Sequence, residues 1–132
     1  SPDGEWASVV VSGTTEGYAI ALNGGQSRRL CARFNCQADW SIGAGSFYLR
    51  FPSGQMGPQR AGRNALIFPV TTGRMLPALP DGGLTAANVN ETIAALGARV
   101  VEEDQVVAGA DPSTDVFLRV ATHSNLFRIP FE

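Results

Sequence analysis

The sequence lacks lysine altogether, and among its 132 residues there are one histidine and two cysteines. All ten basic residues are arginine, which is typical of a GC-rich bacterial genome and indicates origin rather than mechanism. The formal net charge is −2, and no long run of like charges creates a local field. Because nucleic acid is attracted by a basic surface, it is not expected as a partner.

Long apolar runs are also missing. No segment reaches the roughly 18 consecutive apolar residues that a membrane-spanning helix needs, so no transmembrane segment is predicted. The first residues, Ser1-Pro2-Asp3-Gly4, do not have the pattern of a signal peptide. This beginning is compatible with a mature chain whose signal has been removed, and with a lipid anchor that precedes Ser1.

Several motifs that carry chemistry are absent. There is no Gly-x-Ser-x-Gly elbow to expose a nucleophile, and no phosphate-binding or dinucleotide-binding fingerprint. The alternating Asp/Asn loop of a calcium site is missing, as is a second pair of zinc ligands. The sequence therefore predicts no catalytic residue, no metal site and no cofactor.

An enzyme remains the alternative, because His123 has acidic neighbours. It is the only histidine, so any histidine-dependent chemistry must use it. Ser124 follows it directly, and adjacent residues of a strand point to opposite faces, which separates a base from its nucleophile. The carboxylates nearby in the sequence are Glu102, Glu103, Asp104, Asp111 and Asp115. Under this alternative the protein is a small hydrolase or a ligand-binding enzyme.

The two cysteines, Cys31 and Cys36, enclose Ala32-Arg33-Phe34-Asn35. A disulfide that closes so short a loop contributes about 2 kcal/mol and fixes a local bend rather than the whole fold. A bonded pair predicts an oxidising compartment, namely a periplasm or the cell exterior. The alternative is a pair of buried or reactive thiols, although the Cys-x-x-Cys spacing of redox and zinc sites is absent.

What the chain does have is enough apolar material for one core. Apolar residues make up 44% and charged residues 17%, which excludes a disordered tail. A chain of this length removes roughly two-thirds of its surface from water when it folds. We predict one domain over residues 1–132, with a possible subdomain boundary near residues 55–64, where Gly, Pro, Gln and Arg dominate.

Strand patterns outnumber helix patterns. Period-two alternation or β-branched runs predict strands over residues 6–11, 18–22, 47–51, 66–70, 99–101 and 116–120, with a last extended segment at 127–131. The single predicted helix covers residues 86–96, with Thr85 as N-cap, Leu84 and Val89 as a hydrophobic staple and Gly97 as C-cap.

The predicted fold class is therefore α+β, a mostly antiparallel sheet covered by one principal helix. The alternative is a β-rich N-terminal half followed by a small β-α-β-β C-terminal half.

Two groups of residues are candidates for contacts with a partner. Arg28, Arg29 and Arg33 carry planar guanidinium groups suited to a carboxylate or a phosphate. The alternative is that these arginines are solvated or form salt bridges. Phe127, Ile129 and Phe131 lie on one side of an extended segment that pairs with a sheet edge, either its own or a neighbour's. Trp6 and Trp40 are interpreted either as core anchors or as contact residues.

The hypothesis that these features favour is a non-enzymatic, exported bacterial envelope protein. It acts as a binding or assembly module through protein–protein contacts or self-association, with no small-molecule ligand identified. A structural subunit of a filament or larger complex is a further alternative.

Overall fold

Strands dominate the described part of the chain, which in this computed structural model comprises residues 1–41, 43, 45–51, 64–71, 73–103, 106–109 and 114–117. The elements in order are β1 (Trp6–Val10), β2 (Gly17–Ala21), β3 (Arg28–Cys31), β4 (Gln37–Trp40), β5 (Ser46–Arg50), β6 (Ala65–Pro69), α1 (Val89–Leu96), β7 (Arg99–Val101), β8 (Val107–Ala108) and β9 (Asp115–Val116). None of the described helices is long and apolar enough to span a membrane.

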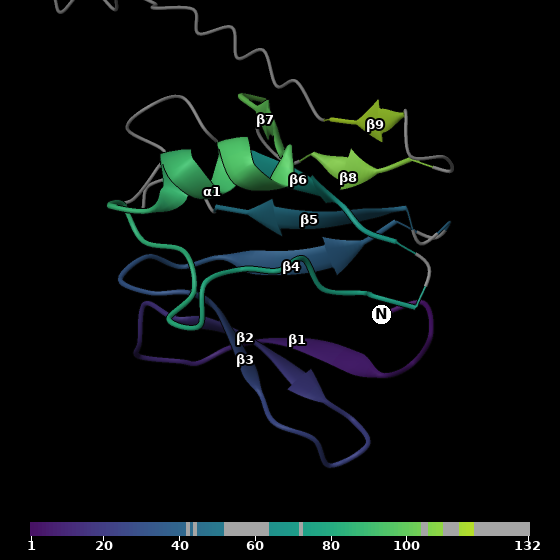
Figure 1. Cartoon of the computed structure of the whole chain (residues 1–132), viewed down its shortest axis with the longest axis vertical. Helices are drawn as coiled ribbons and strands as arrows, with labels where there is room; N and C mark the ends of the chain where they lie inside the picture. The colour runs from purple at the N-terminus through teal and green to yellow at the C-terminus, as the bar shows by residue number, and fades with distance from the viewer. Residues whose placement is uncertain are drawn as a thin grey trace, which may run out of the picture.

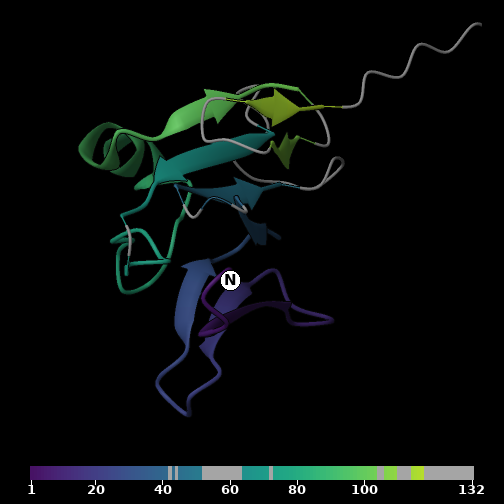
Figure 2. The ribbon, with the colours of Figure 1, turned by 90° about the vertical axis from the view of Figure 1, so that its right-hand side faces the viewer.

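The strands form antiparallel sheets with the orders β1-β2-β3, β4-β5-β6-β7 and β8-β9. The three-stranded sheet lies at one end of the molecule, whereas β7 of the four-stranded sheet and the β8-β9 hairpin lie at the other (Figures 1 and 2). The predicted α+β class, with mostly antiparallel sheets and one helix, is confirmed. β6 and β7 complete a sheet that β4 and β5 begin, so the middle sheet draws on both halves of the sequence.

The middle sheet separates two groups of buried side chains. Phe47, Leu49, Leu66 and Phe68 face the larger core cluster, whereas Tyr48, with Ala65, Ile67, Val101 and Val106, forms a second cluster. Both central strands are therefore covered on both faces, which is why their sequences are continuously apolar rather than alternating.

The first sheet turns its small residues inward. In β2 the glycine and alanines at positions 17, 19 and 21 are buried, whereas Ile20 is 40% and the following Leu22 is 61% exposed. The reason is close approach to the loop before β4, since a Cβ on Gly17 would lie 2.6 Å from Cys36 Sγ. Strand β2 is thus half-buried as predicted, with its large side chains on the outer face.

Helix α1 lies in front of β6 in Figure 1 and packs Val89, Ile93 and Leu96 against the larger cluster. Its C-terminal end is as predicted, because Gly97 adopts φ 63° and donates its N–H to the Ile93 carbonyl.

The beginning of the helix differs from the prediction. It starts at Val89 rather than near residue 86, and its N-cap is Asn88 rather than Thr85. The two residues bond to each other instead, since the Thr85 N–H donates to Asn88 Oδ1 at 2.8 Å and the Asn88 N–H donates to Thr85 Oγ1 at 3.3 Å. These bonds hold residues 85–88 in a turn.

Both residues of the predicted staple, Leu84 and Val89, are buried in the same cluster.

The Cys31–Cys36 disulfide is formed, so the prediction of a bonded pair is confirmed. Its cysteines lie at the end of β3 and just before β4, with a Cα–Cα distance of 6.3 Å, and both are buried. Phe34, inside the loop, packs edge-on against Phe51 with ring centroids 5.4 Å apart. The bridge therefore fixes the bend at which the chain leaves the first sheet and enters the second.

Candidate functional site

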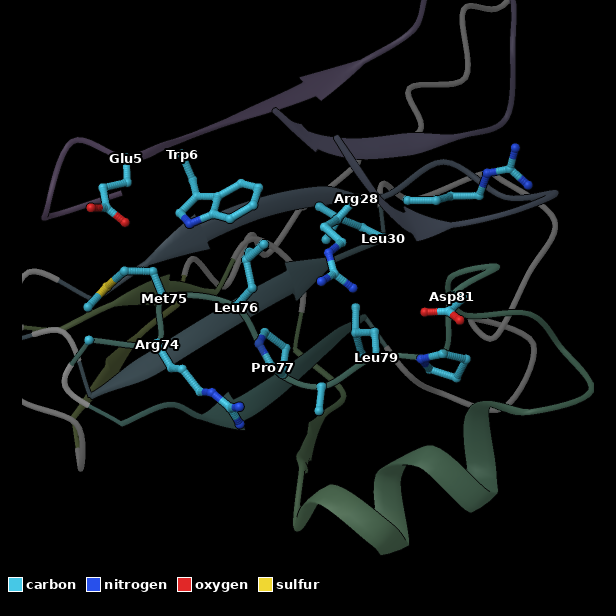
Figure 3. Close-up of a pocket in the computed structure, with 14 residues that line it drawn as sticks. Glu5, Trp6, Arg28, Leu30, Arg74, Met75, Leu76, Pro77, Leu79 and Asp81 are labelled. Carbon is cyan, nitrogen blue, oxygen red and sulfur yellow. The ribbon is translucent and has the colours of Figure 1, made fainter. Parts of the chain in front are cut away.

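A groove runs between the three-stranded sheet and the segment formed by residues 73–81 (Figure 3). Its volume is about 390 Å³. Glu5 and Trp6 line it from the beginning of β1, and Arg28, Arg29 and Leu30 line it from β3. Residues 73–81 form the facing wall, so the groove joins three parts of the chain that are far apart in sequence.

The facing wall is fixed at both ends. Near its beginning, the indole Nε1–H of Trp40 donates to the Met75 carbonyl at 2.7 Å. Beyond its end, the Leu84 N–H donates to the Leu30 carbonyl at 2.9 Å, and the Ala32 N–H donates to the Leu84 carbonyl at 2.9 Å. Pro77 and Pro80 further restrict the backbone between these anchors. These bonds and prolines hold the wall in a defined position relative to β3.

The lining combines apolar and charged side chains. Leu30 and Met75 are buried, while Leu76, Pro77 and Leu79 are half-buried and line the groove. Trp6 is also half-buried and faces this space from β1 (Figure 3).

Two main-chain N–H groups on the same wall have no partner in the part of the chain that the structure describes. The N–H groups of Leu76 and Ala78 have no hydrogen bond to any described residue. A ligand with its own backbone amides could use them as donors.

Arg28 places a positive charge among the side chains that line the groove. Its guanidinium projects from β3 toward Leu76, Pro77 and Leu79 in Figure 3. Within the described residues it forms no ion pair or hydrogen bond. Glu5 and Asp81 lie on opposite sides of it, Glu5 beyond Trp6. Arg74 also lines the groove, on the same side as Glu5 (Figure 3). The groove thus combines Arg28 near its centre with charges of both signs toward its ends.

Arg29, the next residue, is engaged elsewhere. Its Nε donates to the Tyr18 hydroxyl at 3.2 Å, its NH2 lies 3.7 Å from Glu16 Oε1, and its guanidinium lies 5.6 Å from the centre of the Tyr18 ring. The hydrogen bond to Tyr18, followed by the charge of Glu16, raises the pKa of Arg29. Arg29 therefore contributes to the rim of the groove while bonded to neighbours on its own sheet.

The remaining predicted contact residues are not brought to the groove. Arg33 is exposed in the disulfide loop, with φ 67°, and does not line the groove. Phe127, Ile129 and Phe131 lie outside the described residues, as do His123 and Ser124. The hydrolase alternative therefore stays a prediction from sequence.

One of the carboxylates near His123 has a structural role. Asp115 Oδ1 accepts a hydrogen bond from the Tyr48 hydroxyl at 2.8 Å, and its Oδ2 lies 2.5 Å from Arg99 NH1. Burial raises the pKa of Asp115, but hydrogen bonds from Arg99 and Tyr48 outweigh it and hold the pKa below its usual value of 3.8. Asp115 is thus a charged ion-pair partner. In the described part of the chain no three His, Cys, Asp or Glu residues gather as metal ligands.

Residues 74–83 belong to none of the strands or helices predicted from the sequence, and Trp6 was interpreted either as a core anchor or as a contact residue, so the groove was not predicted. The signal was present in Met75-Leu76-Pro77-Ala78-Leu79-Pro80, an apolar run whose two prolines keep it out of a regular sheet. Such a run forms a wall when another element fixes it, which here is Trp40.

Comparisons with protein-family models, with curated proteins and with solved structures give no match, so the function has to be inferred from the groove itself.

Proposed function

We propose that the protein is a non-enzymatic binding module that holds an extended segment of a partner protein in the groove between β3 and residues 73–81. Apolar side chains of that segment pack against Trp6 and the wall residues, and a carboxylate pairs with Arg28. The observation that carries this proposal is the guanidinium of Arg28, which has no ion-pair or hydrogen-bond partner among the described residues and projects toward Leu76, Pro77 and Leu79.

The charge and its surroundings favour a carboxylate. A guanidinium binds a carboxylate through two parallel hydrogen bonds, and such bonds are stronger when water is partly excluded. Arg28 is exposed in the free protein, so apolar side chains of the ligand, packed against Leu76, Pro77 and Leu79, would provide that exclusion. A ligand with only apolar groups would leave Arg28 unpaired, whereas a purely charged ligand would leave Trp6 and Leu79 without contacts.

The wall favours a peptide over other carboxylates. Leu76 and Ala78, two residues apart, each offer a backbone N–H that has no partner among the described residues. Extended peptides bind by main-chain hydrogen bonds and place alternate side chains in neighbouring pockets. Since both ends of the wall are anchored, the wall itself loses little conformational entropy on binding.

The disulfide supports a place outside the cytosol. Structural disulfides are typical of oxidising compartments, and the Cys31–Cys36 bridge is buried at the bend between two sheets. We extend the proposal to an exported protein of the bacterial periplasm or cell exterior, where the groove would engage another envelope protein.

The test is selection of random octapeptides displayed on phage against the immobilised protein. Sequences with alternating apolar residues and one Asp or Glu are expected to be enriched on the natural chain. The Arg28→Glu variant should lose this enrichment, because it places like charges together. Arg33→Glu is the matched control, with the same charge change outside the groove. Equal enrichment on the natural chain and on Arg28→Glu would rule out the groove as the binding site.

A further inference from the structure

We infer that Asn23 is a site of spontaneous covalent modification, at which the side-chain amide is converted to a carboxylate by way of a succinimide ring. The site lies in the turn formed by residues 22–27, between β2 and β3. No residue of this turn lines the groove, so the reaction is independent of the proposed function.

The sequence singles out Asn23, because it is the only asparagine that is followed by a glycine. In this reaction the backbone nitrogen of the following residue attacks the carbonyl carbon of the asparagine side chain. A side chain on that following residue hinders the approach, whereas glycine has no Cβ and leaves the backbone able to rotate. Ring closure is therefore least hindered at Asn23-Gly24.

The turn holds the two reacting atoms in one ring. The Gly25 N–H donates to Asn23 Oδ1 at 3.1 Å. The ring that this hydrogen bond closes contains both Asn23 Cγ and the Gly24 nitrogen, which are the atoms that must form a bond. The same hydrogen bond draws electron density away from Cγ, which makes this carbon more open to attack.

Nothing among the described residues covers or restrains this pair. Residues 22–29 are exposed, and the turn projects from the end of the three-stranded sheet (Figures 1 and 2). Gly24 adopts φ 83°, and a Cβ built on it would meet nothing within 4 Å. Neither the Gly24 N–H nor the Asn23 Nδ2 group has a hydrogen-bond partner in the described part of the chain. The nucleophile and the leaving group are therefore both accessible to water.

Asn88 has the opposite arrangement and serves as an internal comparison. Its Nδ2 donates to the Gly83 carbonyl at 3.1 Å, so the leaving group is held. The N–H of the next residue, Val89, donates to the Thr85 carbonyl at 3.0 Å, so the nucleophile is held as well. Val89 is also β-branched and buried. Asn88 should therefore react far more slowly than Asn23.

The reaction oxidises and reduces nothing. Hydroxide removes the proton of the Gly24 nitrogen, the bond from this nitrogen to Asn23 Cγ forms, and the bond from Cγ to Nδ2 breaks. The departing nitrogen takes up a proton from water and leaves as ammonia. A second water molecule then opens the succinimide at one of its two carbonyls, which gives aspartate or isoaspartate.

The two products differ in their effect on the turn. Aspartate can accept the Gly25 N–H through a carboxylate oxygen, as Asn23 does. Isoaspartate lengthens the main chain by one methylene group, in the turn that leads into β3. Either product adds one negative charge and changes the formal net charge from −2 to −3.

The experiment is incubation of the full natural chain at neutral and mildly alkaline pH. Digestion at acidic pH, where the reaction is slow, and mass spectrometry then follow each asparagine separately. A synthetic peptide of residues 18–28 is incubated alongside as the unfolded reference. Asn23 should convert within about tenfold of its rate in the peptide, because opening an exposed turn costs little free energy. The rate should rise with pH, since the nucleophile is the deprotonated Gly24 nitrogen.

The variant Asn23→Gln should show no conversion in this turn over the same time, because its longer side chain must close a larger ring. Asn90→Gln is the matched control, with the same replacement at an exposed position of α1. It should leave the conversion of Asn23 unchanged. Thermal unfolding of both variants checks that they are folded.

Two results would overturn the inference. The first is an Asn23 that stays intact in the folded natural chain, whether or not the peptide reacts. The second is an Asn88 that converts as fast as Asn23, since neither the following glycine nor the accessible atoms of the turn would then decide the reaction. Both results are obtained from the natural chain, so they do not depend on the folding of a variant.

Discussion

Replacing Gly17 by alanine tests how closely β2 approaches the disulfide. A Cβ at this position would lie 2.6 Å from Cys36 Sγ, 2.8 Å from the Cys36 carbonyl oxygen and 3.1 Å from Cys31 Sγ. The first two distances are shorter than contacts that real Cβ atoms make. Two of the three atoms belong to a bonded pair of sulfurs and the third to the backbone, so none can rotate away.

The expected loss of stability follows from two opposing effects. Overpacking a well-filled core costs about 1–3 kcal/mol. Replacing glycine by alanine also reduces the freedom of the unfolded chain, which favours folding by about 0.4–1 kcal/mol. The net expectation for Gly17→Ala is a free energy of unfolding lower by roughly 1–2 kcal/mol.

The assay is urea unfolding followed by the fluorescence of Trp6 and Trp40. Gly82→Ala is the matched control, because a Cβ there meets nothing within 4 Å. It should leave stability unchanged or slightly raised. The penalty for Gly17→Ala should shrink after reduction of the disulfide, since two free thiols can turn away from the new methyl group.

A Gly17→Ala variant as stable as Gly82→Ala would refute the close packing of β2 against the disulfide. A penalty of the same size in the oxidised and reduced proteins would show that the sulfurs are not the atoms in contact. In that case the strain would come from the Cys36 carbonyl alone.

Two further predictions concern single contacts. Trp40→Phe removes the donor to the Met75 carbonyl and should lower the free energy of unfolding by about 1 kcal/mol. Because the groove wall loses an anchor, the variant should also bind the selected octapeptides more weakly, as measured by calorimetry. Unchanged affinity would show that this hydrogen bond does not shape the groove. Because the pKa of Asp115 is lowered in the folded protein, its contribution to stability is present above the usual value of 3.8 and is lost as the pH falls through its lower folded pKa. The difference in urea midpoint between the natural chain and Asp115→Asn should therefore be large near neutral pH and small at about pH 2. A difference that does not change with pH would contradict the ion pair between Asp115 and Arg99.

The sequence by itself determined the features that depend on neighbouring residues. The α+β class followed from the alternation of strands and the single marked helix. Gly97 ends that helix as predicted because only a residue tolerant of positive φ closes it there, and this requirement is local. The Cys31–Cys36 bond was likewise predictable, since five residues of separation keep the two sulfurs within reach in a tight bend.

The helix start shows where local signals compete. Thr85 is a suitable N-cap, but Asn88 offers a side chain to the same turn and the two bond to each other. The helix then begins at Val89. Neither residue is unusual, and only the geometry of the turn decides between them.

The existence and position of the groove depend on tertiary structure alone. Arg28 and Arg29 are identical in kind and adjacent, yet one faces the apolar lining unpaired among the described residues and the other is bonded to Tyr18. Because the two arginines are adjacent on a strand, their side chains point in opposite directions. Which of them faces the groove depends on where residues 73–81 are held. That position is set by Trp40 and by the bonds of Leu84 to the end of β3. Contacts between segments so far apart in sequence arise from packing, and no local pattern encodes them.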